Sequence, residues 1–220
     1  MRFALLSFAL WFCCAAAPAS AERPVVLVVG DSLSAAYSMQ REEGWPHLMQ
    51  ARLDEIGLDY AVFNSSIAGE TTQGGLARLP RLLERTEPAW VIIELGGNDG
   101  LRGIDLGVTR ANIERMIELS REAGAEVVLA GIKLPPNYGP AYTQRFEAIY
   151  ADLAEAHGTL LVPFILDGVA LDPALMMDDG IHPNAAAQPV LLDNVWKVLG
   201  PRLRGVASAA PSAPAHSPPG

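Results

Sequence analysis

Five short apolar segments alternate with amphipathic ones along most of this chain. The apolar segments are rich in Val, Ile and Leu and lack a polar face; they cover residues 25–29, 60–67, 90–95, 126–132 and 159–165. Strands that are apolar on both sides belong in a parallel sheet whose two faces are both covered. The pattern therefore predicts an α/β fold, a three-layer α/β/α sandwich built on a five-stranded parallel sheet.

The segments between the strands carry the signals of helices. Amphipathic stripes that begin at proline or end at glycine predict helices near residues 46–56, 113–123, 142–157 and 189–199. A further amphipathic segment covers residues 71–87 and contains Pro80. Because an internal proline removes a backbone hydrogen bond, we expect this helix to break near Leu79.

The beginning of the chain has the pattern of a targeting sequence. Arg2 supplies a positive charge, an apolar run follows, and Ala19-Ser20-Ala21 has the small-x-small pattern of a cleavage site. The apolar run is shorter than the roughly 20 residues that a stable membrane anchor needs. Residues 1–21 are therefore predicted to be a signal peptide. The mature protein is expected to be exported, periplasmic or secreted, with no transmembrane anchor.

The remaining chain limits the class of protein. Residues 22–204 are long enough for one domain with a substantial core, whereas residues 205–220, mostly Ala, Ser, Pro and Gly, predict a disordered tail. The two cysteines, Cys13 and Cys14, lie in the signal peptide, so the mature protein lacks thiol chemistry. The net charge is −9 and no basic cluster stands out, so no nucleic-acid partner is expected. We expect a monomer without a metal ion or cofactor.

In open parallel sheets the ligand site lies beyond the carboxyl ends of the strands, where the crossover direction changes. The segments that follow the five strands read GDSLS, AGET, GGNDG, LPPNYG and, after a long connection, DDGIHPN. The first of them places Ser32 at the end of a strand, after Gly30, which allows a tight turn. Ser32 could simply cap a following helix, because serine is a good N-cap residue.

A serine hydroxyl becomes an effective nucleophile when a base takes its proton, and that base is usually a histidine oriented by a carboxylate. Of the four histidines, only His182 lies in a loop at the expected catalytic edge. Asp179 precedes it by three residues, so one turn of chain can bring the carboxylate to Nδ1 and leave Nε2 for Ser32. Asp178 competes for the orienting role. Alone, DGIHP could equally be a turn that begins a helix.

An acyl-transfer site also needs hydrogen-bond donors for the oxyanion that develops on the substrate. The backbone N–H of Ser32 is one candidate. Gly69 follows the second strand, where the missing side chain lets its N–H approach a substrate, and the side-chain amide of Asn98 follows the third strand. GGNDG could be only a turn. The prediction therefore depends on the conjunction of nucleophile, base, orienting carboxylate and donors at one edge of one sheet.

These residues resemble the four sequence blocks of the SGNH, or GDSL-type, hydrolases. GDSLS, Gly69 within AGET, GGND and DGIHPN match the blocks in order. Longer stretches such as SSIAGETTQGGLARLP and MMDDGIHPNAAAQP are similar to bacterial periplasmic multifunctional acyl-CoA thioesterases, proteases and lysophospholipases, and to related arylesterases. The resemblance covers residues 25–199. It implies a flavodoxin-like strand order, 2-1-3-4-5, and no metal.

Carried onto this chain, the family pattern makes Ser32 the nucleophile and makes Asp179 and His182 its catalytic partners. Gly69 and Asn98, together with the N–H of Ser32, then form the oxyanion hole. The resemblance implies a serine esterase that hydrolyses carboxylic esters and thioesters through an acyl-enzyme. Its expected substrates are small-molecule or lipid acyl esters, including aryl esters and lysophospholipids.

Four residues that flank the proposed site are candidates for contact with an apolar acyl or aryl group: Leu101, Pro135, Tyr138 and Ile181. Asp31 has no role in the family pattern. We interpret it as structural support for the loop that carries the serine.

Two other functions stay open. A carbohydrate O-acetylesterase of the same superfamily would need a polar, open groove lined by aromatic side chains. A non-catalytic binding module of flavodoxin or receiver type would also explain the sheet. Asp99 after the third strand could imitate the acceptor of a receiver, although no lysine follows the fifth strand. A lipase of the α/β-hydrolase fold is disfavoured, because it needs Gly-x-Ser-x-Gly around its nucleophile.

Overall fold

The computed structural model describes residues 23–209 and confirms the predicted architecture. Five parallel strands form one sheet in the order β2-β1-β3-β4-β5. The strands are β1 (Val25–Gly30), β2 (Ala61–Asn64), β3 (Trp90–Glu94), β4 (Glu126–Ala130) and β5 (Leu160–Val162). The two edge strands, β2 and β5, are shorter than the apolar segments that predicted them.

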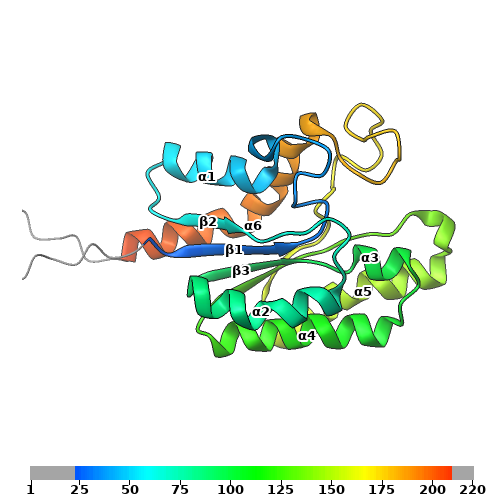
Figure 1. Ribbon diagram of the computed structural model, residues 1–220, viewed down its shortest axis with the longest axis horizontal. Coiled ribbons are helices and arrows are strands. Elements are labelled where there is room, and N and C mark those ends of the chain that lie inside the picture. The colour runs from blue at the N-terminus through cyan, green and yellow to red at the C-terminus, as the bar shows by residue number, and fades with distance from the viewer. Residues whose placement is uncertain (1–22, 210–220) are drawn as a thin grey trace, which may run out of the picture.

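Helices cover both faces of the sheet, so the molecule has three layers (Figure 1). The α-helices are α1 (Trp45–Glu55), α2 (Thr72–Thr86), α3 (Gly97–Leu101), α4 (Leu106–Glu122), α5 (Pro140–His157) and α6 (Gln188–Ala209). Short 3-10 helices are η1 (Arg41–Glu43), η2 (Pro136–Tyr138) and η3 (Ala185–Ala187). Within the described residues, no helix combines the length and the apolar character needed to cross a membrane.

Strand β1 shows why both faces of the sheet are covered. Leu27 and Val29 belong to the core formed with α2, α4 and α5, whereas Val26 and Val28 belong to the core formed with α1 and α6. All four side chains are fully buried. Because successive side chains of a strand point to opposite faces, an unbroken apolar run requires a helical layer on each side.

Helix α2 does not break at Pro80, contrary to the prediction. The helix is continuous, with Pro80 on its exposed side. Leu79, Leu82 and Leu83 are buried in the core beneath it. Burial of such a side chain contributes about 1.5–3 kcal/mol. Three of them therefore outweigh the roughly 3 kcal/mol that an internal proline costs.

Helix α6 is longer than predicted. The sequence predicts an end near Leu199, but the helix continues through Pro201 to Ala209. Leu203, beyond the proline, is fully buried in the core. The first part of the predicted tail, residues 205–209, is therefore helical. The predicted signal peptide and the rest of the predicted tail lie outside the described residues.

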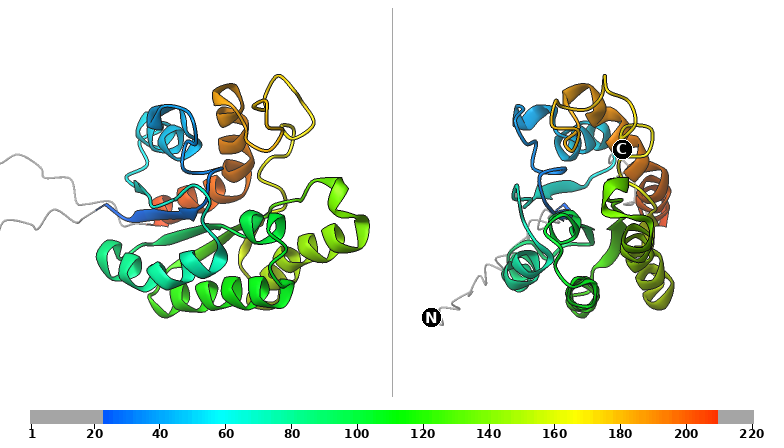
Figure 2. Two further views of the ribbon diagram at one scale, coloured as in Figure 1. Left: turned by 45° about the vertical axis from the view of Figure 1, so that its right-hand side comes forward. Right: turned by 90° about the vertical axis from the view of Figure 1, so that its right-hand side faces the viewer.

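The carboxyl ends of the parallel strands all face one end of the molecule. The turn after β1, the short helix α3 and the loop before α5 lie at this end, on the right in Figure 1. The long connection between β5 and α6, yellow in Figure 2, rises from the same end. Segments far apart in the sequence therefore meet at the edge where the sequence predicts a site.

Candidate active site

Ser32 lies in a tight turn directly after β1. The turn is closed by backbone hydrogen bonds to the carbonyl of Asp31. A Cβ atom on Gly30 would lie 2.8 Å from Oε2 of Glu94, so the last position of the strand must be glycine. Residues 31–39 form turns and bends and no regular helix. The interpretation of Ser32 as a helix cap is therefore wrong, because no helix begins there.

Buried polar side chains hold this turn against the sheet. Ser34 Oγ donates to Oε2 of Glu94 at 2.7 Å and accepts from Nε1 of Trp45 at 3.2 Å. The N–H of Asp31 donates to the same Glu94 oxygen at 3.3 Å. Burial, together with the charge of Asp31, raises the pKa of Glu94 well above its usual range. The turn is thus anchored to the neighbouring strand β3.

Ser32, His182 and Asp179 form one continuous hydrogen-bonded chain. Oγ of Ser32 lies 2.9 Å from Nε2 of His182, and Nδ1 of His182 lies 2.7 Å from Oδ2 of Asp179. A carboxylate can only accept, so Nδ1 carries the proton and Nε2 is free to accept from the serine. The structure thus brings together three residues that are up to 150 positions apart in the sequence.

The backbone around His182 explains why Asp179, and not Asp178, reaches the imidazole. Oδ1 of Asp179 accepts from the N–H groups of Ile181 and His182, at 2.9 and 3.0 Å. This local turn leaves Oδ2 directed at the ring. Partial burial opposes the negative charge, but the hydrogen bonds from His182 and Ile181 outweigh it and lower the pKa of Asp179 to about 2.

A short backbone bridge positions the loop that carries His182. Met176 and Pro183 form an antiparallel bridge, and the N–H of Met177 donates to the carbonyl of His182 at 2.8 Å. These contacts fold the long connection between β5 and α6 back on itself. Backbone contacts at His182 and at the next residue, Pro183, therefore fix the position of the imidazole.

Two backbone N–H groups that the sequence predicts as oxyanion donors have no hydrogen-bond partner within the described residues. Within residues 23–209, neither the N–H of Ser32 nor that of Gly69 donates a hydrogen bond to another group. Gly69 has a φ of +79°, which only glycine adopts readily. The sequence predicts donor roles for both groups, and both remain available to a ligand.

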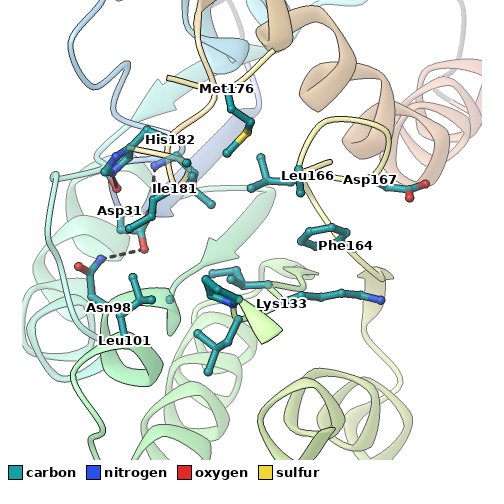
Figure 3. A pocket seen from close by; sticks show the side chains of 18 of the residues that line it. Asp31, Asn98, Leu101, Lys133, Phe164, Leu166, Asp167, Met176, Ile181 and His182 are labelled. Atoms are coloured by element: carbon teal, nitrogen blue, oxygen red, sulfur yellow. Dashed lines mark hydrogen bonds between the residues drawn. The ribbon is translucent and has the colours of Figure 1, made fainter. Parts of the chain in front are cut away.

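The side chain of Asn98 points toward the same end of the sheet, and Figure 3 shows its link to Asp31. Nδ2 of Asn98 donates to Oδ2 of Asp31 at 3.0 Å, while Oδ1 of Asp31 accepts from the N–H of Leu33 at 3.0 Å. Burial raises the pKa of Asp31 to about 6, although these two hydrogen bonds oppose the change. Asp31 thus holds both the turn that carries Ser32 and the side-chain amide of Asn98.

A cavity of about 570 Å³ opens beside Ser32 and His182. Three of the four predicted contact residues line it: Leu101, Pro135 and Ile181. The fourth, Tyr138, is not among the lining residues. Its hydroxyl instead donates to the carbonyl of Leu101 at 3.0 Å, and its ring stacks on that of Tyr142.

Most of the cavity wall comes from residues to which the sequence alone assigns no role. The apolar ones include Leu33, Ile132, Leu134, Phe164, Leu166, Ala170 and Met176. In Figure 3, Leu166, Met176 and Ile181 face Leu101 across the cavity, with Phe164 and Lys133 at the end away from His182. The stretch FILDGVALDPALMM was a usable signal, because it is unusually apolar for a connection that lacks regular structure.

A serine, a histidine and an aspartate in one hydrogen-bonded chain, beside an apolar cavity at the carboxyl edge of such a sheet, are typical of hydrolases. The chain matches the model of the GDSL-like lipase/acylhydrolase family over residues 28–189. It belongs to that family and is a hydrolase, as predicted.

Named relatives extend over most of the chain. It is 50% identical to Esterase TesA of Pseudomonas aeruginosa, across 92% of this chain and 100% of the relative. It is 49% identical to an arylesterase of Vibrio mimicus, across 89% and 96%. It is also 44% identical to thioesterase 1/protease 1/lysophospholipase L1 of Escherichia coli, across 83% and 86%.

Solved structures agree with the fold. The crystal structure of TesA superimposes with a TM-score of 0.79 at 52% identity, covering 80% of this chain and 98% of that one. The psychrotrophic esterase EstA from Pseudoalteromonas sp., inhibited by monoethylphosphonate, has a TM-score of 0.78 at 40% identity, covering 82% and 98%.

Proposed function

We propose that this protein is a serine esterase that hydrolyses carboxylic esters and thioesters of apolar acyl or aryl groups. The observation that carries the proposal is the hydrogen-bonded chain from Ser32 through His182 to Asp179. Ser32 is the nucleophile, His182 the general base and acid, and Asp179 the group that orients the imidazole. No metal ion or cofactor takes part in the proposed reaction.

In the first half of the reaction, Nε2 of His182 takes the hydroxyl proton of Ser32 as Oγ bonds to the substrate carbonyl carbon. The carbonyl oxygen becomes an oxyanion. When the tetrahedral intermediate collapses, the ester or thioester bond breaks, and His182 gives its proton to the departing alcohol or thiol. Asp179, whose pKa is about 2, stays charged and stabilises the imidazolium that forms between these steps.

In the second half, water replaces the alcohol or thiol. His182 takes a proton from the water as the water oxygen bonds to the acyl carbon. The bond between the acyl carbon and Ser32 Oγ then breaks. The serine recovers its proton from His182, and the carboxylic acid leaves. The reaction thus returns every protein group to its starting protonation state.

Three donors are proposed to stabilise the oxyanion: the N–H of Ser32, the N–H of Gly69 and Nδ2 of Asn98. The two backbone groups are free to donate, and Asn98 Nδ2 has a second hydrogen besides the one that Asp31 accepts. Removing one donor of this kind typically costs about 10²- to 10³-fold in kcat.

The cavity favours an acyl chain over an acetylated sugar as the group that binds beside Ser32. Its aliphatic wall includes Leu134, Leu166 and Met176, and, apart from the imidazole of His182, Phe164 supplies the one aromatic ring among the described residues that line it. A carbohydrate O-acetylesterase was expected to have a polar groove lined by several aromatic rings. The relatives named esterase, arylesterase and thioesterase/lysophospholipase support ester and thioester substrates.

The alternative of a receiver-type binding module is disfavoured by the environment of Asp99. Its side chain is buried, and both carboxylate oxygens accept hydrogen bonds from Thr72 at the start of α2. A receiver would need this carboxylate exposed to a phosphate donor. Asp99 instead holds Thr72, the first residue of α2, against α3.

We further propose that the protein is exported, periplasmic or secreted, after removal of residues 1–21. The support is the pattern of charge, apolar run and small residues before Glu22. Expression of the full chain and determination of the mature amino terminus test this proposal, and a mature chain that keeps Met1 contradicts it.

Labelling of the full chain with a fluorophosphonate tests the proposed nucleophile. The reagent is expected to add one phosphonyl group at Ser32 and to abolish hydrolysis of p-nitrophenyl octanoate. Ser32→Ala should remove both labelling and at least about 10⁴-fold of the activity. Ser66→Ala, at a serine two residues after the neighbouring strand β2, is the control and should keep both. A folded Ser32→Ala variant with full activity would falsify the proposal.

A panel of p-nitrophenyl esters from acetyl to palmitoyl, beside an acyl-CoA and a lysophospholipid, tests the substrate class. We expect kcat/KM to be higher for octanoyl than for acetyl esters. Faster hydrolysis of acetylated sugars than of octanoyl esters would support the carbohydrate esterase instead.

A further inference from the structure

Arg102 contacts both segments that carry the proposed oxyanion donors Gly69 and Asn98. It follows α3, four residues after Asn98, and its Nη2 donates to Oδ1 of Asn98 at 3.3 Å. The same Nη2 donates to the carbonyl of Gly69 at 3.0 Å. One guanidinium group therefore connects the loop after β2 with the short helix after β3.

We propose that Arg102 is a positioning residue of the oxyanion hole. It orients the amide of Asn98 so that Nδ2 donates, and it holds Gly69 in place beside Asn98. The inference rests on the proposed function, in which Gly69 and Asn98 stabilise the oxyanion. Arg102 is not expected to contact the reacting atoms.

The orientation of the Asn98 amide follows from its two neighbours. The guanidinium of Arg102 can only donate hydrogen bonds, and an ionised Asp31 can only accept them. With Oδ1 toward Arg102 and Nδ2 toward Asp31, both contacts are favourable. The reversed amide would place donor against donor and acceptor against acceptor. Arg102 and Asp31 together therefore select the orientation that leaves a second N–H for the substrate.

The bond from Arg102 to Gly69 adds to the backbone hydrogen bonds from Ile67 to Gly30 and from Glu70 to Ile67 that hold this loop. Gly69 adopts a φ of +79°, and glycine has the widest range of backbone conformations. The bond from Arg102 fixes its carbonyl and so limits rotation about the Gly69 backbone. Because a misplacement of about 1 Å can reduce a rate roughly 100-fold, such an anchor matters for a donor N–H.

The charge of Arg102 also suits this position. The two oxygens that accept from Arg102, on Gly69 and Asn98, are neutral, so neither of them cancels the positive charge of the guanidinium. That charge lies beside the residues that carry the two proposed donor groups. On the other side of Asn98 lies the buried carboxyl of Asp31. A cation here opposes the effect of that carboxyl on the developing oxyanion.

The test measures kcat and KM for neutral p-nitrophenyl octanoate with the full chain. The variants are Arg102→Ala, Asn98→Ala and the double variant, with Arg115→Ala on the exposed face of α4 as the control. We expect Arg102→Ala to lower kcat about 10-fold with little change in KM, because groups in the hole lose their alignment. In the Asn98→Ala background the same substitution should cost at most about 3-fold, because part of its effect passes through Asn98.

Three results overturn the inference. The first is an unchanged kcat for Arg102→Ala when Asn98→Ala lowers it. The second is a full, additive loss in the double variant. The third, from parallel assays with an acyl-CoA, is an effect confined to the KM of that substrate, since Arg102 would then bind the anionic substrate itself. If Asn98→Ala leaves kcat unchanged, the proposed oxyanion hole is wrong, which is a separate failure.

Two further variants distinguish a positioning role of Arg102 from a general loss of stability. Arg102→Lys keeps the charge but replaces the planar guanidinium with a single ammonium group, so we expect it to restore kcat only in part. Arg102→Gln keeps a donor without the charge. Thermal unfolding should be nearly unchanged for both, because the side chain of Arg102 is exposed. A loss of kcat that merely follows a loss of stability contradicts a positioning role.

Discussion

The ring of Tyr37 packs against the imidazole of His182, with the ring centroids 4.4 Å apart and the planes inclined by 34°. The residues on both sides of Tyr37 have left-handed backbones, with φ of 56° at Ala36 and 55° at Ser38. Such conformations are unfavourable for residues other than glycine. The turn after β1 therefore holds an unusual backbone shape, and that shape presents an aromatic ring to the proposed base.

Replacement of Tyr37 tests the value of this contact. An aromatic pair contributes about 0.5–1.5 kcal/mol, so we expect Tyr37→Ala to lower kcat/KM about 3- to 10-fold. Tyr37→Phe keeps the ring and should stay close to the original activity. Equal losses in both variants would show that the hydroxyl, and not the ring, matters.

The left-handed backbone at Ala36 predicts a stabilising substitution. Ala36→Gly removes a conformational cost of roughly 1–2 kcal/mol, part of which is offset by the greater freedom of glycine in the unfolded chain. We expect the free energy of unfolding in urea to rise by about 0.5–1 kcal/mol. Ala51→Gly, at an exposed position within α1, is a matched control and should lower it by a similar amount. A lower free energy of unfolding for both variants than for the original protein would contradict the prediction.

Asp178 and Asp179 are adjacent in the sequence, so replacing each in turn shows which carboxylate takes part in catalysis. Asp179→Asn keeps the shape of the side chain but no longer fixes the tautomer of His182, so we expect kcat to fall about 10⁴-fold. Asp178→Asn should change kcat less than about 2-fold, because Asp179 makes the contact with Nδ1. Similar losses in the two variants would show that the loop shape, and not the carboxylate of Asp179, is critical.

The buried carboxyl of Glu94 predicts a pH-dependent stability. Its pKa is raised in the folded protein, so the folded state binds this proton more tightly than the unfolded state does. Stability is therefore lost as the pH rises above the ordinary pKa of a glutamate and toward the raised one. Glu94→Gln has no proton to lose and should gain stability relative to the original protein as the pH increases.

Urea unfolding of both proteins at pH 5 and pH 8 measures this difference. The Gln side chain can still accept from Ser34 and from the N–H of Asp31, as Oε2 of Glu94 does. A difference between the two proteins that does not change with pH would contradict a raised pKa of Glu94.

The cavity wall predicts which residues control the length of the acyl group. Met176 points into the cavity in Figure 3, so Met176→Trp should fill part of the space. We expect kcat/KM for p-nitrophenyl palmitate to fall at least about 10-fold more than for the acetate, because a tightly packed site accepts no extra volume. Tyr138 does not line the cavity, so Tyr138→Phe should leave the ratio of kcat/KM for the two esters unchanged. A change in this ratio with Tyr138→Phe alone would instead support the substrate contact that the sequence predicts for Tyr138.

Local patterns were sufficient for much of this protein. The five apolar runs predicted the strands, because a strand buried on both faces is apolar at nearly every position. Asp179 and His182 are three residues apart, so their contact depends on one turn of chain and could be predicted from spacing. Ser32 was found because chemistry in a parallel sheet is confined to the segments after the strands.

Other features depend on groups that are distant in the sequence. Pro80 predicted a break in α2, but burial of the leucines around it keeps the helix intact. Glu94 lies within an apolar strand, and only its contacts with Ser34 and Asp31 reveal a buried anchor. Pro135 and Pro136 line the cavity, whereas the hydroxyl of Tyr138, close to them in the sequence, donates to the carbonyl of the distant Leu101.

The sequence by itself determined the layers of the fold and the short list of groups able to react, since both follow from periodicity and from spacing within a few residues. Only the tertiary structure decided which side chains surround the substrate cavity and that Arg102 joins Gly69 to Asn98. Those contacts connect separate loops whose relative positions are set by packing of the whole sheet. No local pattern encodes them.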